Sequence, residues 1–343
     1  MSSLPYLKLT QEIALIGELF TLKINTFLIW ITVFHIKNIK GGYRILVLAL
    51  ANLEILFAFL EFLIKPFIHC YHSSYIYFTI DKLGSKSLQL YLLLFYSGTY
   101  SILISLIATQ FFYRYCLINR SGSKVISLID KFWWVYCTFW TVLWILSYYQ
   151  CAPDKESIDY LRDAMITEYN TDIEEIAGFF IVVYDKKGSL RVNTLITITG
   201  LIIVLSFQYM VIIFSSWQIQ RNIQKKCSRM SSRIQNMQKQ LFKTLILQIL
   251  IPFFFHHIPG FLHLIGVFLD LDISIPSGVV ITFFSFFPSI DSVFMMCLVA
   301  EYKVAIRKRF EVWVQQILKW LREFDERDRD EEVTITGAKP MFI

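Results

Sequence analysis

Long apolar stretches recur along the 343-residue chain, and they constrain its fold more than any other feature. A helix needs roughly 20 mostly apolar residues to cross a bilayer, where only helices and closed barrels satisfy every backbone polar group. Barrel strands run only about 10 residues each, so stretches of this length favour helices. The apolar stretches are Ile13–Ile36, Tyr43–His69, Ser87–Tyr113, Phe132–Gln150, Val192–Trp217, Leu241–Phe268 and Ile275–Ala300. We therefore predict an all-α membrane protein, a seven-transmembrane helix bundle in the lipid bilayer.

The composition agrees with this prediction. Hydrophobic residues make up 55% of the chain and charged residues only 17%, whereas a soluble domain carries about 25% charged residues. The six cysteines show no CxxC spacing, so neither a zinc site nor a dense disulfide scaffold is indicated. We expect no cofactor, no bound metal and no nucleic-acid partner.

Lysine and arginine gather in three connecting loops, and this asymmetry predicts the orientation of the chain. Basic residues dominate 37–44 and 114–131, and the loop 221–243 holds seven bases and no acid. The loop 151–191 has nine acids against five bases. Because cytoplasmic loops carry the excess of basic residues, we predict an N-terminus outside the cell and a C-terminus inside it. The sequon at Asn119 would then face the cytoplasm and stay unglycosylated.

The chain changes character after Ala300, which divides it into three parts. We predict a short extracellular N-terminus at 1–12, the membrane bundle at 13–300 and a cytoplasmic tail at 301–343. Apolar residues of the tail recur at helical spacing, at Phe310, Trp313, Ile317, Leu321 and Phe324. This pattern, with basic residues near the membrane, predicts an interfacial amphipathic helix. The alternative is a soluble helix that packs on a partner protein.

Polar residues and prolines share one face of the sixth stretch. They are Gln248, Pro252, His256, Pro259 and His263. Polar groups within a spanning helix normally face the bundle interior or a wet cavity, and prolines weaken the helix where it could swing. We therefore predict a hinge at Pro252 and Pro259, with His256 and His257 at the floor of a ligand pocket. The alternative is that these histidines only form hydrogen bonds between helices.

Further candidate residues lie in the second, third and fourth stretches. Tyr96 and Tyr100 combine an aromatic body with a hydroxyl group, which suits a small ligand, and His69 is a further ligand candidate at the end of the second stretch. Cys70 and Cys151 follow the second and fourth stretches on the oxidising side, so their positions allow a disulfide.

Charged residues within the second stretch need a partner. Glu61 and Lys65 lie one helical turn apart, at i and i+4. An unpaired charge at the centre of a membrane helix costs about 3 kcal/mol. We therefore expect an internal ion pair between the two, with ligand binding as the alternative.

Several short motifs follow one another in a specific order. They are Gly41-Gly42-Tyr43-Arg44, Pro66-Phe67-Ile68-His69, Phe112-Tyr113-Arg114-Tyr115, Gln240-Leu241-Phe242 with Gln248 and Pro252, Ile275-Pro276-Ser277-Gly278, and Pro288-Ser289-Ile290-Asp291. From about Asn25 to Lys303, the ordered set resembles the nematode seven-transmembrane chemoreceptors of the Str class. One departure is Ser292 after Asp291, where the family usually has proline.

The resemblance implies a G-protein-coupled chemosensory receptor with the bundle architecture of that class. It also implies a small environmental molecule bound in the outer half of the bundle and a heterotrimeric G protein on the cytoplasmic face. The expected location is the plasma membrane. The resemblance further implies the cilium of a sensory neuron. The residues expected to contact the G protein are Arg114, Tyr115, Arg221, Lys225 and Lys226. For Arg114, the alternative is an ordinary anchor at the cytoplasmic end of its helix.

Two other classes of protein compete with this reading. A ligand-gated channel or transporter is one, although transporters usually show internal inverted repeats and we find no such symmetry. A membrane enzyme with a histidine-bound metal is the other, because His69, His72 and the pair His256-His257 hint at histidine boxes. The chain has only six histidines, and His69 and His72 lie on the outer side. We therefore expect no enzyme.

Overall fold

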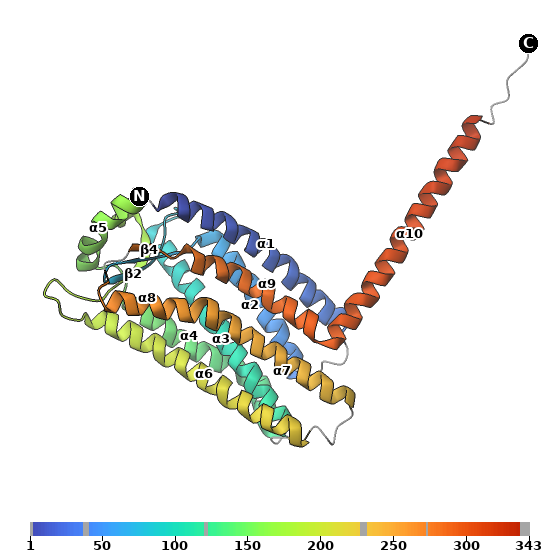
Figure 1. Ribbon diagram of the computed structural model, residues 1–343, viewed down its shortest axis with the longest axis horizontal. Coiled ribbons are helices and arrows are strands. Elements are labelled where there is room, and N and C mark those ends of the chain that lie inside the picture. Colours follow the sequence, from blue (N-terminus) through green and yellow to red (C-terminus); the bar gives the residue numbers. More distant parts are fainter. Residues whose placement is uncertain (1–2, 37–40, 120–122, 227–231, 272–273, 337–343) are drawn as a thin grey trace, which may run out of the picture.

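The computed structural model describes residues 3–36, 41–119, 123–226, 232–271 and 274–336, with backbone alone at 123, 223–226, 233–234 and 325–336. Long helices run side by side in an elongated bundle (Figure 1). The bundle elements are α1 (Leu4–Phe34), α2 (Gly42–Ile64), α3 (Lys86–Asn119), α4 (Ser123–Tyr149), α6 (Val192–Lys226), α7 (Ser232–Pro252), η3 (Phe253–His257), α8 (Ile258–Phe268) and α9 (Gly278–Leu298). Each predicted apolar stretch thus corresponds to a helical passage, with α7, η3 and α8 forming the sixth.

Within the described residues, six of these passages are long and apolar enough to cross a membrane. α4 is the passage that falls short. Its sequence holds tryptophans and tyrosines, whose ring N–H and O–H groups lower the mean hydropathy although the rings are largely apolar. Trp134 and Phe139 still expose 55% and 56% of their surface on the outside of the bundle. These apolar faces suit a lipid environment.

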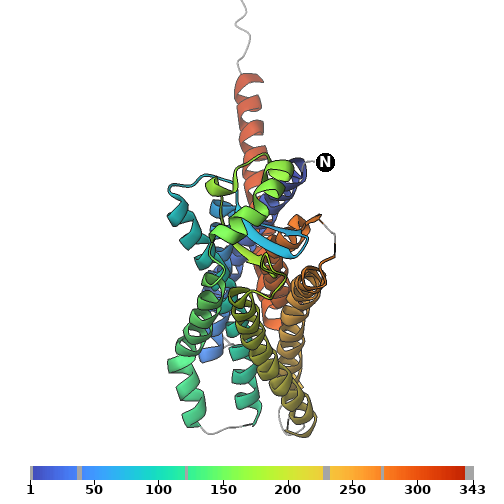
Figure 2. The same cartoon turned by 90° about the vertical axis from the view of Figure 1, so that its left-hand side faces the viewer.

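A four-stranded antiparallel sheet lies at one end of the bundle, which the all-α prediction did not include (Figures 1 and 2). The strand order is β3-β2-β1-β4. The strands are β1 (Phe67–Tyr71), β2 (Ser74–Thr79), β3 (Ala177–Val182) and β4 (Ser274–Pro276). They come from three different loops, after α2, before α6 and before α9. We call this end of the bundle the sheet end.

A separate hydrophobic cluster joins the sheet to the helix α5 (Lys155–Tyr169) and the 3-10 turn η1 (Ile173–Glu175). Phe78 of β2 packs edge-on against Tyr169 of α5, with ring centroids 5.3 Å apart. The N-terminus joins the same layer, since the Ser3 N–H donates to the Glu168 carbonyl at 2.9 Å. The sheet end is therefore a small packed layer of its own.

The end of α2 differs from the prediction. The helix ends at Ile64 instead of His69, because Lys65 adopts a left-handed conformation (φ 47°) and Pro66 follows it. The predicted Glu61–Lys65 ion pair is wrong. Lys65 instead pairs with Asp81, Nζ to Oδ2 at 2.6 Å. The start of α9 also shifts, from the expected Ile275 to Gly278, because 274–276 forms β4.

The bundle core centres on α3, whose side chains are mostly buried. α1 and α9 pack closely along much of their length (Figure 1). Gly17 makes this approach possible, since a Cβ atom there would lie 2.9 Å from the backbone carbon of Ser285. The contact between these helices closes the bundle.

The helix α10 (Ala300–Thr336) begins at the opposite end of the bundle, here called the α10 end. It projects away from the other helices (Figure 1). Phe310 and Trp313 expose 61% and 57% of their surface, and Arg309 lies over the Trp30 ring of α1, 5.8 Å from its centroid. That α10 lies on a membrane surface stays a prediction.

Candidate ligand-binding site

Two prolines shape the backbone of the sixth passage near its middle. Pro252 ends α7 and Pro259 stands at the start of α8, and the turn between them is a π-helix, in which the Ile258 N–H donates to the Phe253 carbonyl. Proline cannot donate a backbone hydrogen bond, which favours such a wider turn, and π turns are frequent at functional sites. This turn carries His256 and His257.

His257 joins the sixth passage to two other helices. Its Nε2 lies 2.8 Å from the Tyr100 hydroxyl of α3, and its Nδ1 lies 2.7 Å from the Tyr209 hydroxyl of α6. Both ring nitrogens therefore have a tyrosine partner. His257 and Tyr100 were predicted site residues, and the structure brings them into contact.

His256 packs among aromatic rings beside this group. Its ring centroid lies 4.0 Å from that of Phe284 and 5.0 Å from that of Tyr100. Its Nδ1 is buried and has no hydrogen-bond partner among the described residues. A polar atom in this state can accept from, or donate to, a molecule that enters the site.

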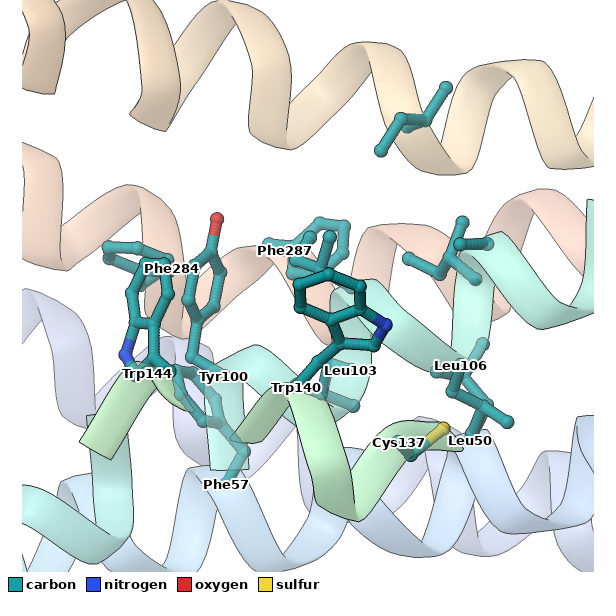
Figure 3. Packing of buried hydrophobic residues seen from close by; sticks show 14 of the residues in the cluster. Leu50, Phe57, Tyr100, Leu103, Leu106, Cys137, Trp140, Trp144, Phe284 and Phe287 are labelled. Carbon is teal, nitrogen blue, oxygen red and sulfur yellow. The ribbon is translucent and has the colours of Figure 1, made fainter. Parts of the chain in front are cut away.

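Aromatic residues support the histidines from below. Figure 3 shows Tyr100, Trp144 and Phe284 side by side, with Phe57 below them in this view. The Trp144 indole N–H donates to the Ser97 hydroxyl at 2.7 Å, which fixes the ring. Tyr96, also a predicted ligand residue, stacks on Phe57 with ring centroids 4.5 Å apart and is not among the residues that line the cleft described below.

A cleft of about 450 Å³ opens beside the histidines, between α4, α6 and α8. This volume lies within the usual range for small-molecule sites. Tyr75 of β2 and Ile181 of β3 cover it at the sheet end, and both are buried. Its polar lining includes Tyr209, His256 and His257, whereas the remaining walls are mostly apolar. An apolar cleft with a few convergent polar groups is the usual form of a small-molecule site.

His69 lies elsewhere, within β1 of the sheet. Its Nδ1 lies 2.6 Å from the Tyr169 hydroxyl and its Nε2 lies 3.1 Å from the Ser274 hydroxyl. Burial lowers the pKa of His69 to about 4, although nearby Glu168 raises it. His69 is not among the residues that line the cleft. The structure therefore does not bring it together with His256, and it acts as a link within the sheet end.

Cys70 and Cys151, whose positions allow a disulfide, are both free, buried thiols in the structure. The Cys151 sulfur lies 3.1 Å from the Thr197 hydroxyl. Burial raises the pKa of the Cys70 thiol to about 12, with a hydrogen bond to Ser277 acting in the opposite direction. Both thiols are thus held in protonated, unreactive surroundings.

The predicted G-protein contacts lie near the α10 end. Arg114 is only 2% exposed. Its Nη1 donates to Gln238 Oε1 of α7 at 3.0 Å, and its guanidinium lies over the Tyr43 ring, 3.9 Å from the centroid. Arg114 therefore links three helices, which an anchor in the membrane interface would not do.

The other predicted contacts surround this arginine. Tyr115 packs edge-on against Phe214 of α6 at 5.6 Å. Arg221 is exposed and lies over the Trp217 ring, 4.7 Å from its centroid. Lys225 and Lys226 belong to the last turn of α6, and their side chains lie outside the described residues.

Sequence reasoning missed Tyr209 and the contacts of a buried polar chain in the middle of the bundle, although it predicted that Gln248 faces the bundle interior. In that chain, Ser292 donates to Asn25 Oδ1 at 2.5 Å and contacts Glu54 Oε2 at 3.3 Å. Gln248 donates to Asp291 at 2.9 Å. Each of these residues interrupts an apolar stretch, and that interruption is the signal that could have found them.

Comparisons with known proteins agree with this architecture. The chain is similar in fold to squid rhodopsin, with a TM-score of 0.58 at 14% sequence identity over 90% of this chain and 86% of that one. A family model described as the serpentine type seven-transmembrane GPCR chemoreceptor Str matches residues 10–307. The chain belongs to the Str family of chemoreceptors. Str family relatives include the G-protein coupled receptor str-33 of Caenorhabditis elegans, 36% identical over 88% of this chain and 91% of that protein.

A more distant relative is the serpentine receptor class r-10 of the same nematode, 21% identical over 89% of this chain and 92% of its own length. Both of these relatives are described as receptors. Among the described residues, no three His, Cys, Asp or Glu side chains come together in an arrangement that could hold a metal ion.

Proposed function

We propose that this Str chemoreceptor binds a small molecule in the cleft beside His256 and His257 and then activates a heterotrimeric G protein. The observation that carries the proposal is the position of His257, which hydrogen-bonds tyrosines of α3 and α6 from the π turn of the sixth passage. A ligand that changes these contacts would change how three helices are held together. A ligand shifts a conformational equilibrium only through such differential contacts.

The hydrogen bonds of His257 also indicate the chemistry of the ligand. A neutral imidazole has one N–H donor and one acceptor nitrogen. If Tyr100 donates to Nε2, then Nδ1–H donates to the Tyr209 oxygen, and the Tyr209 hydroxyl proton is left for another partner. Tyr209 lines the cleft, whereas Tyr100 is not among its lining residues. A ligand with a hydrogen-bond acceptor, such as a carbonyl or an alcohol, would select this tautomer.

The path to the G protein runs along the sixth passage. Below the π turn, α7 leads to Gln238, which holds Arg114 at the α10 end. Movement of α7 about Pro252 would separate Gln238 from Arg114. The arginine, with Tyr115, Arg221, Lys225 and Lys226, would then be available to the G protein.

The proposed orientation places the sheet end outside the cell. α1 begins at the sheet end and α10 begins at the opposite end, so the two termini leave the bundle on different sides (Figure 1). Among the described residues that flank these loops, Arg44, Arg114 and Arg221 lie toward the α10 end, as expected for a cytoplasmic face. The proposed location is the plasma membrane. Membership of the family favours the membrane of a sensory cilium.

The test is a ligand screen in cells with a second-messenger readout, followed by variants of the tyrosines. A hydrogen bond is worth about 0.5–1.5 kcal/mol, so Tyr209→Phe should weaken the potency of an acceptor-bearing agonist by about 3- to 10-fold. Tyr91→Phe is the matched control, because Tyr91 lies in α3 and is 62% exposed. Unchanged potency of every such agonist on Tyr209→Phe, at equal surface expression, would contradict the proposed site.

A further inference from the structure

A second cavity lies on the other side of the sheet end, between α1 and α2. Its volume is about 300 Å³, and residues of α1, α2 and α9 line it. Two buried acidic residues line it, Glu18 from α1 and Glu61 from α2. Their side chains belong to residues that are 7% and 1% exposed. This cavity shares no lining residue with the cleft beside the histidines.

The protein satisfies these carboxyl groups only in part. Ser285 of α9 donates its hydroxyl to Glu61 Oε1. Within the described residues, Glu18 Oε2 and Glu61 Oε2 have no hydrogen-bond partner. The Tyr96 hydroxyl lies beside Glu61 but outside hydrogen-bond geometry. Buried acceptors in this state carry a desolvation cost that a donor could remove.

The basic groups at the cavity do not neutralise the pair. Lys65 lines the cavity, yet its Nζ lies 2.6 Å from Asp81 Oδ2. Lys8 and Glu12 are exposed at its mouth and carry opposite charges. Among the described residues, neither buried carboxyl therefore has an ion-pair partner, and a bound ammonium group could supply one.

We propose that Glu18 and Glu61 form a second binding site, for a small primary amine with an apolar body. The ammonium group has three donors and can reach both carboxyls. Apolar side chains at Ala14, Leu15, Phe62 and Ile281 line the remainder of the cavity and would receive the hydrocarbon part. Because Glu61 also holds Ser285 of α9, an amine bound here would stabilise the junction of α1, α2 and α9.

The chemical alternative is an empty cavity in which one carboxyl is protonated. Probes of equal length separate the two cases. Octylamine and octanol have the same hydrocarbon chain, but only octylamine carries an ammonium group at neutral pH. The full receptor, purified in lipid nanodiscs, can be unfolded by heat with a thiol-reactive fluorophore as the reporter, since Cys70, Cys137 and Cys151 are buried.

We expect octylamine to raise the midpoint of thermal unfolding in a saturable manner, by about 3 °C or more, and octanol to give no comparable shift. Glu18→Gln and Glu61→Gln should each abolish the shift, whereas Glu12→Gln at the mouth should retain it. Should Glu61→Gln fail to fold, Leu15→Trp provides a second test, because it fills the cavity and keeps both carboxyls.

The proposal fails if both probes shift the midpoint equally, or if the amine shift survives in Glu18→Gln and in Leu15→Trp. His257→Phe separates this site from the cleft. It should impair the response to agonists and leave the octylamine shift intact.

Discussion

Replacement of Gln238 by leucine removes the acceptor that holds Arg114 against α7 at the α10 end. The bond has an ordinary length of 3.0 Å, and the arginine is 2% exposed, so little water can reach the guanidinium to replace the lost acceptor. A hydrogen bond to a charged group contributes about 1.5–3 kcal/mol. Since about 1.4 kcal/mol is a factor of ten in an equilibrium constant, Gln238→Leu should shift the equilibrium between resting and active states about 10- to 150-fold toward the active state.

The consequence is basal signalling. A minor state populated at about 0.1% would rise to about 1–13% after this shift. Gln238→Glu should act in the opposite direction, because a carboxylate binds the guanidinium more strongly and stabilises the resting state. The assay is ligand-free second-messenger production in cells that display equal amounts of receptor. Gln235→Leu, one turn earlier in α7, serves as the control for a new apolar side chain.

Two results with the Gln238 variants would contradict this prediction. Equal basal output from Gln238→Leu, Gln238→Glu and the unmodified receptor would show that the Arg114 contact does not hold the resting state. Higher output from both variants would point to general loosening of α7.

Two further predictions concern stability. Gly17→Ala should lower the midpoint of thermal unfolding by an amount equivalent to about 1–3 kcal/mol, because the added Cβ would lie 2.9 Å from the Ser285 backbone. Gly260→Ala is the control and should have little effect, because a Cβ atom there would meet open space. Because burial lowers the pKa of His69 to about 4 in the folded state while the unfolded value is about 6.5, the unfolded state binds more protons between these values. The contribution of His69 to stability should therefore fall by about 1–2 kcal/mol as the pH drops from 7 to 5, and His69→Gln should reduce the loss of stability over this range by about that amount in the same melting assay.

The helical passages could be predicted because each one is long, and an apolar run of that length has few other solutions in a bilayer. The sheet could not be predicted in the same way. Its first strand, Phe67–Tyr71, continues the apolar run of α2, and hydrophobicity alone does not distinguish a short buried strand from a helix end. Pro66 was the available signal, because the residue before a proline disfavours the helical conformation.

The candidate site could be predicted in part, because some of its residues are unusual in a membrane helix. The histidines and the two prolines of the sixth passage stand out as costly or disruptive residues in a membrane helix, so the sequence points to them. Their partners depend on packing between helices. Tyr209 of α6 lies far from His257 along the chain, and only the tertiary structure shows that the two meet. The Glu61–Lys65 ion pair was predicted from helical spacing and is wrong, because Lys65 lies beyond the end of α2.

The sheet has a mechanical consequence for the receptor. Three loops share one hydrogen-bonded layer, and β4 attaches the connection between α8 and α9 to β1. The strands thereby hold the sheet end together, so we expect a change in the sixth passage to tilt α7 about η3. The twenty residues from Ser232 to Ile251 span about 30 Å of helix, and a tilt of about 10° over that length would carry the tip of α7 at the α10 end about 5 Å sideways. A small displacement beside His257 is thus amplified where the G protein would dock.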